Sequence, residues 1–459
     1  MGAMERLVVI GGDAAGMSAA SQARRRKGPD ELEIVAIERG NYTSFSACGI
    51  PYYVSNVVED LGELVVRTPE EFRAKRAIDV RMRHEATAID LGKGAVEVRD
   101  LESDETSWES YDELLVATGA QPLRLELEGS DARKIFGVQV LDDGVAIDEF
   151  IDAEDPKRAV IVGGGYIGLE MAEALVVRGL DVTVVELAPQ PMSALDPDMG
   201  ELVADAMRGL DIDLRTAAEV TAFETSGGDV SGVVTAEGTL PADIVVLGLG
   251  ARPNVQLAKD AGIEIGTSGG IAVDRRMHTP SENVWAAGDC AEKLHRVGKH
   301  HVSIALGTHA NKEGRVAGIN IGGGDETFPG VVGTAAVKVC DLECARTGLK
   351  TAEAESLGFE VESVVVDATT RAGYFPGAAP IKTKLVVERS SARLLGAQII
   401  GKEGAAKRID VFATALWNEM TVDEMLNMDL SYAPPFSPVW DPVLIAARTA
   451  WSKIEAVRA

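Results

Sequence analysis

The chain has 459 residues, too many for a single hydrophobic core, so two or three domains are expected. Its composition, 46% hydrophobic and 25% charged, is typical of a globular protein. The 72 acidic residues outnumber the 45 basic ones, and a net charge of −27 would repel nucleic acids and anionic membranes. We therefore expect no nucleic-acid partner and no membrane partner, and no stretch of the sequence resembles a membrane span or a signal peptide.

The cysteines favour a reducing compartment. Four cysteines (Cys48, Cys290, Cys340 and Cys344) are too few for a disulfide scaffold in a chain of this length, which predicts a cytoplasmic protein. Cys340 and Cys344 lie close together but lack a second pair or a nearby histidine. We predict that both are core residues and that the chain has no metal site.

A dinucleotide-binding unit is predicted at the N-terminus. A buried strand over 7–10 runs into Gly11-Gly12-Asp13-Ala14-Ala15-Gly16, which opens a helix, and a second strand over 32–37 ends at Glu38. In such a βαβ unit the glycines admit a pyrophosphate to the helix N-terminus, and the acidic residue accepts a hydrogen bond from a ribose hydroxyl. Asp13 occupies the place of the second glycine of the motif, so this copy alone is a weak signal.

The segment Ser44-Phe45-Ser46-Ala47-Cys48-Gly49-Ile50-Pro51-Tyr52 follows this unit and contains the candidate reactive group. Cys48 is predicted at a helix start, where free backbone N–H groups and the helix dipole favour a thiolate. The alternative is that Cys48 is a small buried hydrophobic residue. Its position directly after a dinucleotide unit favours the reactive role.

A second dinucleotide-binding unit begins about 150 residues later. A strand over 159–162 precedes Gly163-Gly164-Gly165-Tyr166-Ile167-Gly168 and a helix, and the next strand, 181–185, ends at Glu186. All three glycines of the motif are present. Two such units are far more specific than one, and two dinucleotides imply electron transfer between them.

The second unit is predicted to prefer NADH. Glu186 would repel the 2′-phosphate of NADPH, and no lysine or arginine lies between Gly179 and Met207 to attract it. NADPH is therefore the less favoured cofactor.

Further strands are predicted over 114–116, ending in the small residues Ala117-Thr118-Gly119, and over 244–249. A strand over 283–287 is expected to deliver Gly288-Asp289 to a helix start, where the Asp289 carboxylate would meet the ribityl hydroxyls of a flavin. The alternative for Gly288-Asp289 is a simple turn and helix cap.

Together these motifs resemble the FAD- and pyridine-nucleotide-dependent disulfide reductase superfamily over essentially the whole chain. The 44–52 segment is similar to that of the single-cysteine branch, which includes coenzyme A disulfide reductase, NADH oxidase and NADH peroxidase. The resemblance implies an α/β fold with two Rossmann-like dinucleotide-binding domains and a C-terminal α+β dimerisation domain. The implied boundaries are an FAD domain of 1–113 and 250–325, interrupted by an NAD domain of 114–249, and a dimerisation domain of 326–459 in a homodimer.

The pattern of the C-terminal region fits this division. Strands are predicted near 335–339, 363–367, 383–388 and 394–400, followed by helices from Glu403. The predicted cofactor-binding residues of the whole chain are Gly11, Gly12, Ala15, Gly16, Glu38, Arg39, Ser46, Ala117, Thr118, Gly119, Gly163, Gly165, Tyr166, Ile167, Gly168, Glu186, Gly250, Gly288 and Asp289.

The resemblance also implies proton donors and a substrate site. Tyrosines from the partner subunit flank the cysteine in coenzyme A disulfide reductases, which assigns Tyr374 and Tyr432 as donors to the leaving thiolate. Phe375 and Phe436 stand where these motifs often hold second tyrosines. The implied substrate-binding residues, which would hold the phosphates of coenzyme A, are Gln22, Arg25, Ser44, Asn311 and Arg315. The alternative is that the basic run ending the first helix only complements the helix dipole.

The residues around Cys48 restrict its chemistry. In the dithiol branch a second cysteine lies five positions further on, where this chain has Tyr53. Cys48 must therefore form a mixed disulfide, a persulfide or a sulfenic acid. All six histidines precede residue 310, so the C-terminal catalytic histidine of the dithiol branch has no counterpart. Asp13-Ala14-Ala15 occupies the loop where peroxidases carry a histidine, which counts against peroxide reduction.

The predicted function is NADH-dependent reduction of coenzyme A disulfide, through FAD and a mixed disulfide on Cys48. One alternative is an NADH oxidase that uses a Cys48 sulfenic acid. Another is a persulfide or polysulfide reductase with the same pocket. An electron-transfer reductase for a ferredoxin-like protein would not need Cys48, and its docking surface should be basic, unlike that of this acidic chain.

Overall fold

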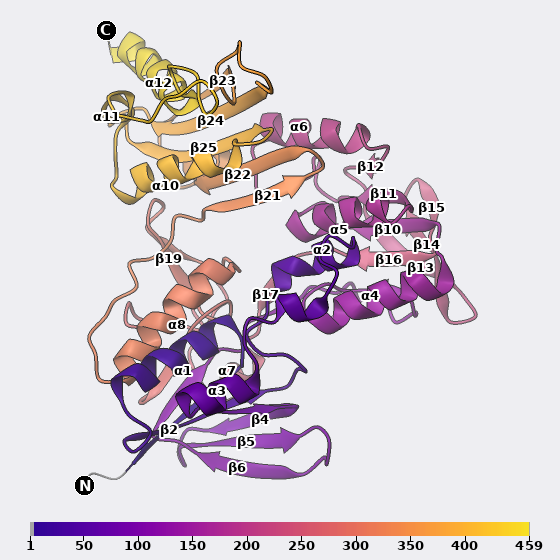
Figure 1. Cartoon of the computed structure of the whole chain (residues 1–459), viewed down its shortest axis with the longest axis vertical. Coiled ribbons are helices and arrows are strands. Elements are labelled where there is room, and N and C mark those ends of the chain that lie inside the picture. Colours follow the sequence, from indigo (N-terminus) through magenta and orange to yellow (C-terminus); the bar gives the residue numbers. More distant parts are fainter. Residues whose placement is uncertain (1–3, 459) are drawn as a thin grey trace.

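The computed structural model describes residues 4–458, so the outermost residues of the first and last predicted domains lie outside the described part. Three five-stranded sheets form the centres of three bodies, with the C-terminal body above the two nucleotide-type units (Figure 1). The two parallel sheets and the mixed α/β content confirm the predicted fold class.

The first sheet is parallel, with the strand order β18-β7-β1-β2-β3. Its central strands are fully buried because they share one hydrophobic core with neighbouring helices and with an antiparallel sheet that contributes Ile89, Val96 and Val98, which explains their continuous apolar runs. The edge strand β18 comes from far along the chain, after the whole second unit. The strands are β1 (Glu5–Ile10), β2 (Leu32–Glu38), β3 (Asp79–Met82), β7 (Glu113–Val116) and β18 (Val284–Ala286).

Two helices, α1 (Ala14–Arg26) and α8 (Gly307–Ile321), pack against each other beside this sheet (Figure 1). Their backbones approach closely, because a Cβ on Gly314 would come within 2.2 Å of the Ala15 carbonyl oxygen. Gly318 has the same relationship to Ala19, also at 2.2 Å. Glycine at these two positions therefore sets how close α8 lies to the start of α1.

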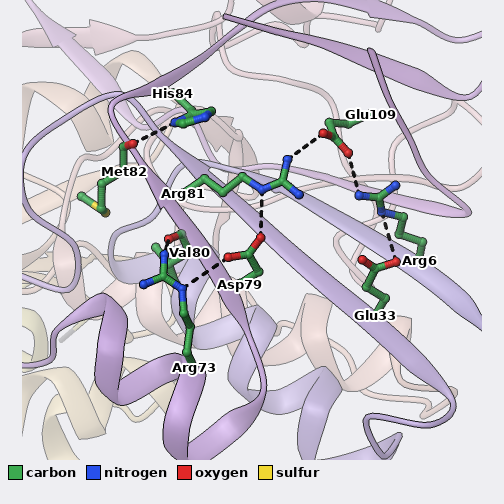
Figure 2. Close-up of polar contacts among 9 residues, drawn as sticks. All are labelled: Arg6, Glu33, Arg73, Asp79, Val80, Arg81, Met82, His84 and Glu109. Atoms are coloured by element: carbon green, nitrogen blue, oxygen red, sulfur yellow. Dashed lines mark hydrogen bonds and ion pairs between the residues drawn. The ribbon is translucent and has the colours of Figure 1, made fainter. Parts of the chain in front are cut away.

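The antiparallel sheet of β4 (His84–Asp90), β5 (Ala95–Asp100) and β6 (Thr106–Ser110) is tied to the first sheet by a charged network. Figure 2 shows Glu109 of β6 between two guanidinium groups, with Arg6 and Arg81 each donating to it at 2.6 Å. Arg81 also donates to Asp79 at 2.8 Å. Because Glu109 is half-buried and both of its oxygens are used, the network holds β6 against β1 and β3.

The second unit repeats the first. Its parallel strand order is β12-β11-β10-β16-β9, and all five strands lie within one segment of the chain, residues 135–247. The strands are β9 (Ile135–Phe136), β10 (Arg158–Val162), β11 (Asp181–Val185), β12 (Asp213–Arg215) and β16 (Ile244–Leu247). The helices are α4 (Leu141–Glu154), α5 (Tyr166–Val177) and α6 (Pro197–Arg208), and a small antiparallel sheet holds β13 (Val220–Ser226), β14 (Asp229–Thr235) and β15 (Gly238–Pro241).

The two connections between the units lie side by side. β8 (Ala120–Pro122) pairs antiparallel with β17 (Ala251–Pro253). Gly119 and Gly250, which precede these strands, both have left-handed backbones, with φ of 68° and 86°. The chain thus leaves the first unit and returns to it through a two-stranded ribbon.

The C-terminal body is an antiparallel sheet with the order β21-β22-β25-β24-β23, covered by helices. The strands are β21 (Ala335–Val339), β22 (Leu342–Gly348), β23 (Val361–Thr369), β24 (Pro380–Glu388) and β25 (Leu394–Gly401), and the helices are α9 (Thr351–Ser356), α10 (Ile409–Trp417), α11 (Val422–Leu426) and α12 (Pro442–Arg458). The four predicted strands are confirmed, and β22 was not predicted. Cys340 and Cys344 are buried, as expected.

One sequence prediction is wrong. Asp289 does not begin a helix, because the chain closes a turn in which the Ala291 N–H donates to the Gly288 carbonyl, at 3.0 Å. The chain then continues as β19 (Lys293–His295), paired with β20 (His300–Val302), and the next helix is α8.

Candidate active site

Two glycines of the first loop, Gly11 and Gly16, leave no room for a side chain. Gly11 has φ of 109°, and a Cβ there would lie 2.1 Å from the carbonyl oxygen of Ala117. A Cβ on Gly16 would lie 1.9 Å from the carbonyl oxygen of Gly11. The loop therefore brings bare backbone to the N-terminus of α1, the arrangement that binds a pyrophosphate.

The second loop has the same geometry. Gly163 has φ of 107°, and a Cβ there would come within 2.4 Å of the Gly248 carbonyl oxygen. A Cβ on Gly168 would lie 1.9 Å from the Gly163 carbonyl oxygen, the same distance as in the first unit. The two loops are structural repeats.

The acidic residue that ends the second strand is held in the same way in both units. Glu38 accepts the backbone N–H groups of Gly12 and Gly40, each at 2.7 Å. Glu186 accepts those of Gly164 at 2.6 Å and Ala188 at 2.7 Å. Each carboxylate oxygen keeps a further lone pair, so each residue can still accept a ribose hydroxyl.

The Gly288–Asp289 turn faces the first glycine loop. A Cβ on Gly288 would lie 2.8 Å from the Cβ of Ala15. Asp289 Oδ1 is buried and has no hydrogen-bond partner among the described residues, and burial raises the pKa of its carboxyl group. A buried acceptor without a partner beside a glycine loop fits a hydroxyl-bearing cofactor such as FAD.

The other predicted cofactor residues occupy the edges of these loops. Thr118 donates to the Asn254 carbonyl at 2.6 Å and so connects the first unit to the return ribbon. Gly165 caps α5, Tyr166 and Ile167 form its first turn, and Ile167 is exposed. Arg39 and Ser46 are also exposed, directly after Glu38 and just before Cys48.

Cys48 lies in the short helix η1 (Ala47–Gly49), immediately before α2 (Ile50–Val54), and is exposed. The prediction of a helix start is confirmed, but the prediction of a favoured thiolate is wrong. Partial burial and the nearby carboxylate of Glu170 raise the pKa of the thiol, and the backbone N–H of Cys48 lowers it less. Glu170 arrives from α5, so the sequence around Cys48 gave no sign of it.

Glu170 itself was not predicted as a site residue. Burial, and then the charge of Glu173, raise the pKa of its carboxyl group to about 7. The same carboxylate also raises the pKa of Tyr52, after the larger effect of burial. Its position one turn after Tyr166 on α5 is the sequence signal that could have identified it.

A cavity of about 480 Å³ lies beside the Cys48 segment, between α1, α8 and the loop before Cys48. All five predicted substrate residues contribute to its wall: Gln22, Arg25, Ser44, Asn311 and Arg315. Ser46, two residues before Cys48, lines it too, so the cavity extends toward the thiol. Asp13 also lines it, and burial raises the pKa of that carboxyl group to about 6.

Two arginines that were not predicted extend this positive site. Arg67 lines the same cavity and also a smaller adjoining one of about 260 Å³, which Arg76 lines. Burial lowers the pKa of Arg76, and repulsion from Arg25 and Arg67 lowers it further, so the three guanidinium groups lie close together. None of the three forms an ion pair with another residue of the described chain. In a protein of net charge −27 such a cluster indicates a polyanionic ligand.

Tyr374 and Tyr432 lie together in the C-terminal body. A hydrogen bond from one phenol to the other is the main reason that the pKa of Tyr432 is raised. Both are exposed, Tyr374 by 78%, and Phe436, Val439 and Trp440, which follow Tyr432 in the sequence, are exposed as well. The structure thus brings the two tyrosines together, on a different part of the chain from Cys48.

The described residues contain no helix long and apolar enough to cross a membrane. Within the same residues, no group of three or more histidine, cysteine or acidic side chains is placed to hold a metal ion.

Two glycine loops of equal geometry, a free acceptor for a flavin and an exposed cysteine between them define a two-dinucleotide redox protein. The chain belongs to the pyridine nucleotide-disulphide oxidoreductase family, whose model matches residues 5–314, and residues 334–442 match the dimerisation domain of that family. The family uses FAD and NAD(P)H, and the residues of both loops fit these cofactors.

The similar proteins span the whole chain. An NAD(P)H sulfur oxidoreductase (CoA-dependent) of Pyrococcus abyssi is 39% identical over 96% of this chain and 97% of its own length. An NADH oxidase of Methanocaldococcus jannaschii is 36% identical, covering 98% and 99%. A coenzyme A disulfide reductase of Staphylococcus epidermidis is 32% identical, covering 95% and 97%. The structure of reduced Bacillus anthracis CoADR-RHD superposes with a TM-score of 0.95 at 35% identity, covering 99% of this chain and 81% of that one.

Proposed function

We propose that this protein is an NADH-dependent flavoprotein reductase that cleaves coenzyme A disulfide into two coenzyme A thiols. The observation that carries the proposal is the pair of adjoining arginine-lined cavities, one that includes Ser46 beside the Cys48 segment and a smaller one that includes Arg76, with Arg67 in the wall of both. Coenzyme A carries several phosphates at one end and its sulfur at the other. A positive cavity next to an exposed thiol matches that distribution of charge.

The protein residues have distinct roles in this reaction. Arg25, Arg67 and Arg76 bind the phosphates, and the Cys48 thiolate attacks one sulfur of the disulfide. A Cys48–coenzyme A disulfide forms as the first coenzyme A leaves and takes a proton. Two electrons and a proton, derived from NADH, then release the second thiol and restore Cys48. The Gly11–Gly16 loop and Asp289 would hold FAD, which would supply the two-electron relay between NADH and sulfur.

We infer that the active enzyme is a homodimer. The dimerisation domain and the exposed aromatic surface around Tyr374 and Phe436 support this. In a dimer, Tyr374 and Tyr432 of one subunit would act next to Cys48 of the other, as donors to the leaving thiolate. A cytoplasmic location remains a prediction from the cysteine content.

NADH is the proposed electron donor. The Glu186 carboxylate, held by two backbone N–H groups, would repel a 2′-phosphate, and exposed Leu187 follows it in place of a basic residue. Comparison of kcat/KM for NADH and NADPH tests this, and a preference for NADPH would overturn it.

The main experiment measures anaerobic NADH-dependent reduction of two disulfides, coenzyme A disulfide and pantethine, which lacks the phosphates. Wild type should prefer coenzyme A disulfide. Arg67→Ala should lower the ratio of coenzyme A disulfide turnover to pantethine turnover by roughly tenfold or more, and pantethine turnover itself should not change. Cys48→Ser should abolish both activities while retaining FAD. Turnover that survives Cys48→Ser would refute the mechanism.

Sulfur reduction is the second candidate, favoured by the likeness to the CoA-dependent sulfur oxidoreductase. The Cys48 thiolate would then attack the outer sulfur of a coenzyme A persulfide in the same cavity, with coenzyme A thiol as the leaving group. Two electrons from NADH would reduce the resulting Cys48 persulfide to thiolate and hydrogen sulfide. Faster turnover with coenzyme A persulfide than with coenzyme A disulfide would select it. Brisk aerobic NADH consumption without any disulfide would instead select the NADH oxidase, which the Methanocaldococcus relative represents.

A further inference from the structure

A buried ion pair lies directly behind the Gly288–Asp289 turn and has no role in the reaction described above. Lys293 and Glu313 have fully buried side chains, each 0% exposed, and their charged atoms are 3.5 Å apart. Glu313 comes from α8 and Lys293 from the start of β19. Removing two charges from water has a desolvation cost that their mutual attraction often does not repay, so stability alone is a weak explanation for this pair.

The pair forms hydrogen bonds with both backbone polar groups of Gly288, its N–H and its carbonyl. Glu313 Oε2 accepts the N–H of Gly288 at 2.8 Å, and Lys293 Nζ donates to the carbonyl of the same glycine, also at 2.8 Å. Lys293 donates further to the Ala291 carbonyl at 3.0 Å. With Glu313 these contacts use the three N–H donors of the ammonium group.

Lys293 also acts electrostatically on Asp289. Its positive charge lowers the pKa of the Asp289 carboxyl, against the larger effect of burial, and the backbone of Leu306 bonds to that carboxyl as well. Asp289 Oδ1 nevertheless has no hydrogen-bond partner in residues 4–458. A buried ammonium group close to a buried carboxylate would normally pair with it.

The other titratable neighbours do not replace Glu313 as a partner of Lys293. His309 lies one turn earlier on α8, and burial and the charge of Lys293 lower its pKa to about 4, so its ring is neutral near pH 7. Cys290 is buried and burial raises the pKa of its thiol. Burial raises the pKa of Glu313 to about 7, against the charge of Lys293, and Glu313 is the neighbouring carboxyl group that competes with Asp289 for the ammonium group.

We propose that Glu313 keeps the ammonium group of Lys293 away from Asp289, so that Asp289 Oδ1 stays free for a hydroxyl group of FAD. Glu313 and Lys293 are thus positioning residues for the flavin and touch neither substrate nor the reacting sulfur. Without Glu313, Lys293 turns to Asp289 and occupies the acceptor that the cofactor needs. Without both charges, Asp289 is free again.

The test measures FAD dissociation from the purified full-length holoenzyme, by flavin fluorescence after dilution, in single and double variants. Glu313→Gln should raise the dissociation constant of FAD roughly tenfold or more, the loss expected for one hydrogen bond to a charged group. The double variant Glu313→Met/Lys293→Met should recover most of the affinity. A second mutation that restores binding is a result that general destabilisation does not produce.

The exposed pair Lys299–Glu419, at 3.0 Å, is the matched control, and Glu419→Gln with Lys299→Met should leave FAD binding unchanged. Thermal unfolding of the flavin-free forms is followed in parallel. Unchanged FAD affinity in a less stable Glu313→Gln would make the pair purely structural and overturn the proposal, as would a double variant that binds FAD no better than Glu313→Gln. The inference rests on the proposed FAD site, which FAD binding by wild type tests separately.

Discussion

The negative charge of Glu170, on α5, acts on Cys48 and disfavours its thiolate, and α5 contacts α2, the helix that follows Cys48. Burial is the larger cause of the raised pKa of the thiol, and Glu170 is the next. The pKa of Glu170 is itself raised to about 7, so its charge is complete only above neutral pH. The electrostatic environment of the candidate nucleophile is thus set by a residue of the second nucleotide unit.

Glu170→Gln should lower the pKa of Cys48, because it removes the second cause of the shift and leaves burial unchanged. The rate of alkylation of Cys48 by iodoacetamide, followed by mass spectrometry between pH 6 and 10, should rise at lower pH than in wild type. Glu149→Gln, an exposed change on α4, is the control and should reproduce the wild-type profile. Identical profiles for all three proteins would contradict the electrostatic explanation.

Asp13 makes the stability of the flavin-free protein depend on pH. Its pKa rises from 3.8 to about 6, mainly by burial, so the folded state holds the proton more tightly than the unfolded chain. The resulting stability is complete below about pH 4 and is lost as the pH rises through 6. Asp13→Asn should therefore be more stable than wild type at pH 8, by on the order of 2–3 kcal/mol, and gain nothing at pH 4.

Denaturant unfolding of both flavin-free proteins at the two pH values measures this difference. Asp60→Asn, in an exposed turn where Asp60 accepts the Gly62 N–H, serves as the control for loss of an acidic residue. A gain for Asp13→Asn that is equal at both pH values would rule out the protonation of Asp13 as its cause.

Because the two glycine loops have the same geometry, matching substitutions should cause similar losses of stability, each with a loss of cofactor binding in its own unit only. A Cβ at Gly16 or Gly168 would lie 1.9 Å from a backbone oxygen, so each alanine variant should lose about 1–3 kcal/mol of stability in its own unit. Gly16→Ala should weaken FAD binding, whereas Gly168→Ala should retain FAD and weaken NADH binding. Flavin content and NADH titration distinguish the two. Gly307→Ala, where no atom lies within 4 Å of the new Cβ, should change neither.

Lys384 of the C-terminal sheet forms ion pairs with two aspartates of the second unit. It is 8% exposed and reaches from β24 to Asp196 at 3.1 Å and Asp198 at 2.7 Å. Lys384→Met leaves the buried Asp196 without its cation and should cost about 3 kcal/mol or more. Lys382→Met, on the same strand with a more exposed partner at 2.6 Å, should cost less than about 1 kcal/mol. Urea unfolding compares them, and equal losses would contradict the role of burial.

Local patterns predicted most of the fold and the cofactor loops. The apolar runs that became β1 and β10, and the glycines after them, are contiguous in sequence, so their periodicity and spacing carry the information. β22 was missed because Leu342-Glu343-Cys344-Ala345-Arg346-Thr347-Gly348 has few β-branched residues and is stabilised by its neighbours in the sheet.

The parts of the site that were missed depend on tertiary contacts. Arg67 and Arg76 approach Arg25 only when α3 (Pro69–Arg76) packs beside α1, and Glu170 reaches Cys48 only when the two units meet. The helix start at Cys48 was correct, yet local sequence could not reveal the carboxylate that opposes the thiolate. Similarly, the expected helix after Asp289 gave way to a turn that the distant Glu313 supports.

The insertion of the second unit has a consequence for the order in which the chain folds during synthesis. Every strand of the second sheet has been made once Leu247 has emerged from the ribosome. The first sheet still lacks β18 at that point, and α1 lacks α8, its packing partner. The unit that begins second along the chain can therefore finish folding first, while the N-terminal strands wait for the segment that completes them.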